Sequence, residues 1–231
     1  MKHLLLLPIL TGLTMSAMAG GVTTPDESTI YFAQLSAGYS RTQSTPELKL
    51  QGGLSLSEAP VRWGYRFGLG VLAKPINHYV LGIEAALAQY TKNKWLFSPL
   101  VSSVEQDLKG VEILASVRRH LNSATTLALK GGASILRQKI KPMNVFNNPA
   151  RFQFQHAGSS TKVRPILAVE LSHHMTANTL AFINYSHVFG SRQATVVAAS
   201  GPAPTLFANQ SWNKAPSINN VMAGITVAFN A

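Results

Sequence analysis

The chain has 231 residues, a formal net charge of +11 at pH 7 and no cysteine. The lack of cysteine excludes a disulfide framework and a thiolate metal site, and the length suits one domain of the barrel class. The positive charge fits either nucleic acid or an anionic membrane surface, and the export signal described next favours the membrane.

The N-terminus has the pattern of a secretory signal. Lys2 forms a basic n-region, Leu4–Leu13 an apolar core, and Ala17–Ala19 a small-residue cleavage site. The apolar run is short for a membrane anchor, and no other stretch of the sequence approaches the ~18 to 20 apolar residues of a transmembrane helix. We therefore predict a signal peptide at residues 1–19 and a mature domain at residues 20–231, exported across the inner membrane.

Eight segments of alternating polarity follow in the mature chain. They cover Thr29–Ser40, Arg62–Ala73, Tyr79–Tyr90, Leu108–Arg119, Thr125–Leu136, Val163–His173, Thr179–Gly190 and Ile218–Phe229. Each is roughly as long as a tilted strand that crosses a bilayer. The connections alternate between long and short, so an antiparallel barrel would place four long loops on one rim and three short turns on the other. Outer-membrane barrels have this asymmetry, with the long loops outside the cell.

Apolar and charged side chains occupy opposite faces of these segments. Successive side chains of a strand point to opposite faces. In the segment Arg62–Ala73, Phe67 and Leu69 share one parity, whereas Arg66 shares the other with glycines. The charged face carries too few charges to cover a water-exposed surface. We therefore expect an apolar belt that faces lipid around a polar interior, rather than a secreted lipocalin-like barrel or a soluble sandwich.

Aromatic residues near the segment ends predict two interfacial girdles. The periplasmic girdle comprises Tyr31, Tyr79 and Phe229, and the outer girdle comprises Tyr39, Trp63, Tyr90 and Phe189. The segment Thr179–Gly190 is the least regular. There we expect Ala181, Ile183 and Tyr185 to point outward, and Leu180 and Phe182 to point inward.

The last segment, Ile218–Phe229, has apolar residues at every second position and ends in an aromatic residue, followed by Asn230 and Ala231. It resembles the C-terminal strand of bacterial outer-membrane barrels, although those strands end on the aromatic itself. With the signal peptide, the eight strands and the unequal rims, the chain resembles the OmpA/OmpX-type family of small barrels, which includes the opacity-protein-like surface antigens. The resemblance implies an all-β, eight-stranded antiparallel up-and-down transmembrane barrel in the outer membrane. It also implies that the assembly machinery recognises the last strand.

Charged residues of inward parity form the first candidate site. They are Arg66, Glu84, Glu112, Arg118, Lys130, Arg164 and Glu170. Because an isolated buried charge is costly, these groups should pair across a narrow lumen. Two interpretations follow: a network that fills the interior and fixes the strand register, which an eight-stranded barrel favours, or a charge-lined conduit for small solutes.

The third long loop forms the second candidate site. It contains five cations and two aromatic residues and no acidic residue: Arg137, Lys139, Lys141, Arg151, Lys162, Phe152 and Phe154. Cations beside phosphorylated lipid gain phosphate contacts, Arg especially. The loop would therefore contact lipopolysaccharide or a host or cell-surface ligand. The alternative is a solvated basic loop without a specific partner.

The segment Tyr185–Phe189 bears on whether the chain is an enzyme. It resembles the strand of outer-membrane lipid A deacylases that carries a His-x-Ser pair, with His187 in the place of the base. Phe189 stands where the serine nucleophile would be, and Ser186 has the opposite parity. Since no hydroxyl lies beside the imidazole to be activated, we predict no catalytic residue. We also predict no metal, no cofactor and no nucleic-acid partner.

The sequence therefore predicts a non-enzymatic outer-membrane surface protein with a structural or adhesin-like role, exerted through its extracellular loops. A narrow channel for small solutes through the lumen is the alternative function. A lipid A-modifying enzyme is the third hypothesis.

Overall fold

The computed structural model describes residues 29–42, 55–57, 62–76, 79–98, 102–144, 158–190, 197–200, 205–208 and 215–230. The predicted signal peptide, residues 1–19, lies outside these ranges. Within the described residues, no helix has the length and apolarity needed to cross a membrane.

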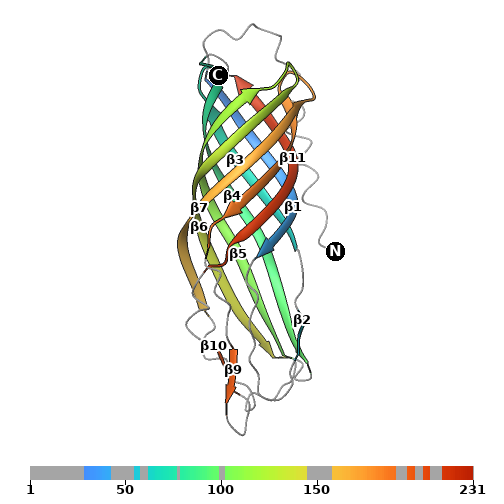
Figure 1. Cartoon of the computed structure of the whole chain (residues 1–231), viewed down its shortest axis with the longest axis vertical. Coiled ribbons are helices and arrows are strands. Elements are labelled where there is room, and N and C mark those ends of the chain that lie inside the picture. The colour runs from blue at the N-terminus through green and yellow to red at the C-terminus, as the bar shows by residue number, and fades with distance from the viewer. Residues whose placement is uncertain are drawn as a thin grey trace, which may run out of the picture.

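Long strands close into one antiparallel barrel (Figure 1). In chain order they are β1 (Ile30–Thr42), β3 (Arg62–Leu72), β4 (Tyr79–Ser98), β5 (Ser102–His120), β6 (Thr125–Asn144), β7 (Gly158–His174), β8 (Thr179–Val188) and β11 (Ile218–Asn230). Each pairs with the strands next to it in this order, and β1 pairs with β11 to close the cylinder. The predicted all-β, eight-stranded up-and-down barrel is confirmed.

Three short strands complete the described elements. The segment β2 (Ser55–Ser57) pairs with the far end of β4, and β9 (Val197–Ser200) pairs with β10 (Thr205–Ala208) in a separate hairpin. The sequence pattern did not predict them, because each is too short to show a periodicity.

The barrel wall separates apolar and charged side chains as predicted. Phe67, Leu81 and Ile113 are 45%, 46% and 55% exposed on the outer face, whereas Arg66 and Glu84 are 6% and 1% exposed inside. A continuous belt of large exposed apolar side chains requires an apolar solvent, so it faces the hydrocarbon of a membrane.

The irregular strand β8 also has the predicted orientation. Leu180 and Phe182 are buried inside the barrel, and Ile183 and Tyr185 are exposed on the outer face. Ala181 has the same outward parity and is half-buried.

Aromatic side chains lie at both ends of the belt, with one correction to the prediction. Exposed aromatic residues include Tyr31, Tyr79 and Phe229 at one end and Tyr39, Trp63 and Phe189 at the other. The prediction of Tyr90 in the outer girdle is wrong, because Tyr90 is fully buried in the barrel. Its even number gives it the inward parity of Glu84, and its hydroxyl donates to Glu112 Oε1 at 2.6 Å.

The two ends of the barrel differ in strand length. At the end that holds the C-terminus in Figure 1, short turns join β5 to β6 and β7 to β8. At the other end, β4, β5, β6 and β7 continue beyond the other barrel strands as a projecting sheet (Figure 1), which we call the extension.

The extension corrects the predicted loop boundaries. Residues 91–107 and 137–162 were predicted as long loops. Instead, β4 continues to Ser98, β5 begins at Ser102, β6 continues to Asn144 and β7 begins at Gly158. These segments pair residue by residue along three strand pairs. The remaining parts of the predicted long loops lie largely outside the described residues.

Candidate functional site

The inward charges gather in an ion-pair network inside the barrel. The Nζ atom of Lys130 lies 2.9 Å from Glu84 Oε2 and 2.6 Å from Glu170 Oε2. The guanidinium of Arg66 has Nη1 at 2.6 Å from Glu84 Oε1 and Nε at 2.7 Å from Glu112 Oε2. These residues come from β3, β4, β5, β6 and β7. The contacts of Arg66 with Glu112 and of Lys130 with Glu84 connect strands that do not pair directly, whereas the other two connect neighbouring strands.

Neutral groups and Arg118 complete this network. Gln34 donates from Nε2 to Glu170 Oε2 at 2.9 Å and accepts from Arg66 Nη1 at 2.7 Å. Arg118 Nη1 lies 4.0 Å from Glu170 Oε1, and its guanidinium carbon lies 4.9 Å from the centre of the Phe32 ring. The network therefore sets three cations against three carboxylates, which offsets the cost of burying each charge.

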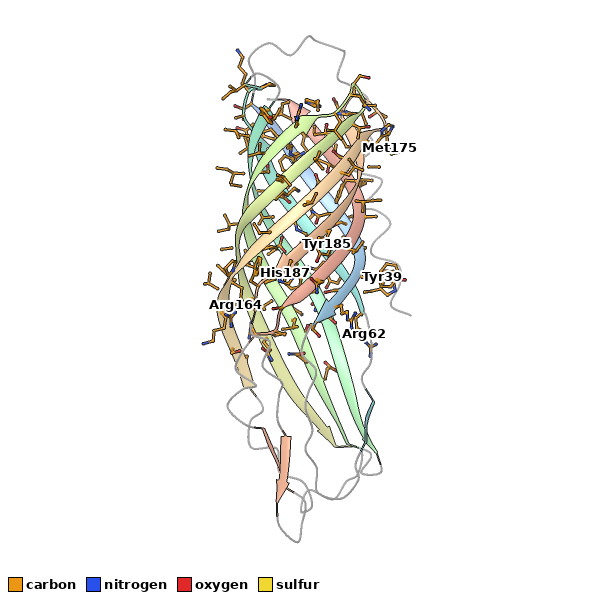
Figure 2. All side chains as sticks on the ribbon, in the orientation of Figure 1. Tyr39, Arg62, Arg164, Met175, Tyr185 and His187 are labelled. Carbon is orange, nitrogen blue, oxygen red and sulfur yellow. The ribbon has the colours of Figure 1, made fainter. Side chains whose placement is uncertain are left out.

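Arg164, the remaining inward charge of the prediction, is not part of the network. It lies on β7 opposite Ser134. Within the described part of the chain it has no ion pair, and its Nε is buried without a hydrogen-bond partner, as is that of Arg62. Figure 2 shows these two arginines on opposite sides of the barrel, near the end from which the extension projects.

A cluster of apolar side chains fills the lumen on the extension side of the network. Its members are Ala88, Tyr90, Leu108, Leu114, Leu136, Ile166, Val188, Ala215 and Ile218. A void of about 10 Å³ lies where this cluster meets Arg66 and Glu112, which is room for one water molecule at most. The cluster was not predicted from the sequence, although most of its members have inward parity.

The outer face of the extension carries a cationic hollow. Lys109 is opposite Arg137, and Asp107 is opposite Lys139, across the β5–β6 pair. These four residues line a hollow of about 260 Å³. Asp107 Oδ2 lies 3.3 Å from Lys109 Nζ, and Oδ1 accepts from Gln89 Nε2 at 2.7 Å. The hollow therefore contains three cations and one carboxylate, and its net charge is positive.

Of the predicted basic-loop residues, the structure brings Arg137 and Lys139 together. Lys141 follows in β6, with its backbone opposite Glu105. Lys162 lies on β7, opposite Leu136. It has the inward parity, unlike Arg137 and Lys139, which have the outward parity. Arg151, Phe152 and Phe154 lie outside the described residues. Lys109 and Asp107 were missed, although the alternation of β5 continued past Val111 would have placed both on the outer face.

A second polar group lies on the outer face of β8 and β11. Asn219 Oδ1 lies 2.7 Å from His187 Nδ1 and accepts from the Tyr185 hydroxyl at 3.0 Å. An amide oxygen only accepts, so His187 Nδ1 carries a proton, and in the neutral imidazole Nε2 is then an acceptor. The Phe189 ring stands edge-on to the imidazole, with 4.5 Å between centroids.

A further hollow of about 740 Å³ is an open, apolar groove on the lipid-facing wall, lined by side chains such as Leu81, Ile83, Leu129 and Leu167. Its lining also includes the inward residues Ser116 and Lys130, so it borders the charged layer of the lumen. Such a groove suits the acyl chains of the surrounding membrane.

Comparison with known proteins gives a fold but no sequence family. No family model matches the sequence, and no curated protein matches it. Among solved structures, the outer membrane protein OprG from Pseudomonas aeruginosa matches with a TM-score of 0.50 and 10% identity, over 89% of this chain and 98% of that one. The chain has the fold of the small eight-stranded outer-membrane β-barrels.

Two other outer-membrane barrels match at lower TM-scores. Ail of Yersinia pestis, solved in complex with the heparin analogue sucrose octasulfate, has a TM-score of 0.44 and 13% identity, over 86% of this chain and 99% of that one. Neisserial surface protein A has a TM-score of 0.44 and 14% identity, over 86% and 97%.

Proposed function

We propose that this outer-membrane barrel is a non-enzymatic surface protein whose extension binds the phosphate groups of lipopolysaccharide. The supporting observation is the position of the cationic hollow. The next outward pair toward the membrane is Val111 and Ile135, which are 41% and 40% exposed in the apolar belt. Arg137 follows Ile135 by two residues, or about 7 Å along a strand. The cations thus lie where lipid phosphates meet the hydrocarbon.

The chemistry of the hollow suits phosphate. The guanidinium of Arg137 can bind phosphate oxygens in a bidentate manner, and ammonium groups add charge from either side. Asp107 holds Lys109 and is itself held by Gln89, which orients the cluster. Farther along the extension, Lys92 pairs with Glu105 at 3.1 Å.

Export and assembly are part of the proposal. Residues 1–19 act as a cleaved signal peptide, residues 20–231 form the mature protein, and β11 carries the signal for the outer-membrane assembly machinery. Phe229 supports this role, because it lies near the end of β11 and is 40% exposed on the outer face. The protein then resides in a bacterial outer membrane with the extension outside the cell.

We assign the buried charge network a structural role rather than that of a conduit. The ionic layer and the apolar cluster follow one another along the described lumen, and the void between them has room for one water at most. Paired charges from several strands fix the register of the barrel.

Lipopolysaccharide binding at low and high salt tests the proposal. The variant R137S/K139S removes one Arg and one Lys from the hollow, and K74S/R119S removes the same charges from the opposite end of the barrel. Hydrogen bonds to charged groups are strong, so we expect the first variant to bind at least about tenfold more weakly at low salt. Its residual binding should also depend less on salt. Equal binding by both variants and the parent protein would refute the proposal.

A further inference from the structure

A row of polar side chains crosses three strands on the outer face, on strands other than those of the cationic hollow. Arg41 of β1 is opposite Asn219 of β11, and Asn219 is opposite His187 of β8. Side chains directly opposite on one face of a sheet lie about 5 Å apart. With strands spaced about 4.8 Å apart, the row spans about 10 Å, which is close to the length of a disaccharide.

Aromatic residues lie beside this row on its membrane side. Tyr39 is opposite Trp63 on one side and Val221 on the other, and Val221 is opposite Tyr185. The Tyr39 and Trp63 rings lie 4.6 Å apart and are 52% and 66% exposed. Figure 2 shows Tyr39, Tyr185 and His187 at a similar height on the barrel. Such rings combine an apolar face with a polar tip, which suits the boundary between headgroups and hydrocarbon.

The polar row has free donors and a free acceptor. Asn219 Oδ1 is occupied by His187 Nδ1 and by the Tyr185 hydroxyl. In the described part of the protein, Asn219 Nδ2, His187 Nε2 and the Arg41 guanidinium have no hydrogen-bond partner. A hydroxyl both donates and accepts, so it matches a neighbouring donor and acceptor. For the neutral imidazole, a fully ionised phosphate, which only accepts, would leave Nε2 unmatched.

We propose that Arg41, Asn219 and His187 bind the saccharide headgroup of a glycolipid in the outer leaflet. The sugar hydroxyls bond to Asn219 Nδ2 and His187 Nε2, a ring packs against Tyr39 and Trp63, and the acyl chains follow the apolar belt. The inference rests on the proposed function only in placing this face in the outer leaflet. Its residues differ from those of the hollow, and it uses hydrogen bonds in place of phosphate ion pairs.

Nuclear magnetic resonance of the refolded barrel in dodecylphosphocholine micelles tests this site. Dodecyl maltoside is added as the probe, because it offers an uncharged disaccharide on the same alkyl chain. We expect saturating shifts of the Asn219 side-chain amide and the His187 ring nitrogens, the latter identified with His187→Phe. The absence of such shifts would overturn the inference, as would the same shifts on adding more dodecylphosphocholine.

Variants give a second, independent test. Removing one neutral hydrogen-bonding partner, in Asn219→Leu or His187→Phe, should weaken maltoside binding about fivefold. Tyr39→Ala should also weaken it, whereas Tyr31→Ala, at the other end of the belt and equally exposed, should not. Unchanged binding by Asn219→Leu and Tyr39→Ala would overturn the inference.

These variants also separate the two proposals. If the saccharide site is real, R137S/K139S keeps its maltoside response and Asn219→Leu keeps its salt-sensitive binding of lipopolysaccharide. Loss of the maltoside response in R137S/K139S would contradict the assignment of the sugar to β1, β8 and β11. If R137S/K139S bound lipopolysaccharide as well as the parent protein does, the proposal for the cationic hollow would fail, and the maltoside response would still be expected.

Discussion

Lys130 Nζ lies 2.6 Å from Glu170 Oε2 inside the barrel, and both side chains are almost completely buried. The same ammonium lies 2.9 Å from Glu84. One cation therefore bridges two carboxylates that come from β4 and β7. Because a buried carboxylate without a partner is strongly unfavourable, the stability of the barrel should depend on this lysine.

Replacing Lys130 by Met should destabilise the barrel by about 3 to 5 kcal/mol, since it leaves Glu84 and Glu170 without their shared cation. Urea unfolding in lipid vesicles measures this loss. Lys92→Met is the matched control, because it breaks an exposed ion pair with Glu105 and should change the free energy of unfolding by less than about 1 kcal/mol. Similar losses in the two variants would contradict a central role for Lys130.

Two adjacent glycines should respond differently to alanine. A Cβ at Gly132 would collide with the backbone carbonyl of Ile113, whereas one at Gly131 would lie 3.3 Å from the Leu167 side chain. Gly132→Ala should therefore cost about 1 to 3 kcal/mol of overpacking, and Gly131→Ala should cost clearly less. The free energies of unfolding of both variants under identical conditions give the comparison. An equal loss would show that the backbone around Gly132 shifts to accommodate the added Cβ.

The filled lumen predicts that the wild-type protein produces no discrete openings in planar bilayers. Shortening only the apolar cluster, with Leu136→Ala and Ile166→Ala, should leave the barrel closed because the ionic layer remains. Adding Arg66→Ala removes a guanidinium that bridges the lumen and should allow openings. Reproducible openings of the wild-type protein that disappear in Gly68→Leu, where the new side chain would enter the network at Glu84, would instead support a channel.

The proposed orientation can be tested in cells, because the chain has no cysteine of its own. Lys139→Cys on the extension should react with a membrane-impermeant maleimide in intact cells. Ser123→Cys, in the short turn between β5 and β6, should react only after the outer membrane is permeabilised. The reverse pattern would place the extension in the periplasm and remove the basis for lipopolysaccharide binding.

The barrel could be predicted because each strand has one face toward the hydrocarbon of the membrane and the other toward a polar lumen. Phe67 faces hydrocarbon and Arg66 faces the lumen, so the alternation of polarity is imposed at every step. Tyr90 was placed wrongly because proximity to a strand end was given more weight than parity. The network partners could not be derived, since the contact of Arg66 with Glu112 depends on how side chains from distant strands meet across the lumen.

The extension was harder to predict for a different reason. Beyond the membrane, both faces of a strand meet water, and the apolar alternation that reveals a strand disappears. A register shift between Gln89 and Thr91 also changes the parity, so that Thr91 is buried and Lys92 is exposed. A bulge of this kind inserts a residue without a clear sequence signal. The orientation of the β4 side chains beyond Tyr90 therefore became visible only with the paired strands in place.

The Gln34–Glu170 hydrogen bond of 2.9 Å bears on how the protein assembles. Gln34 belongs to the first barrel strand, and Glu170 comes late in the chain, so their contact forms only when the sheet has curled almost fully round. A partly assembled cylinder that ends at β6 would leave Lys130 without Glu170 in a membrane interior. Such intermediates are unfavourable because they contain an incompletely paired buried charge. The last strands should therefore insert in the same cooperative step in which Lys130 and Glu170 pair.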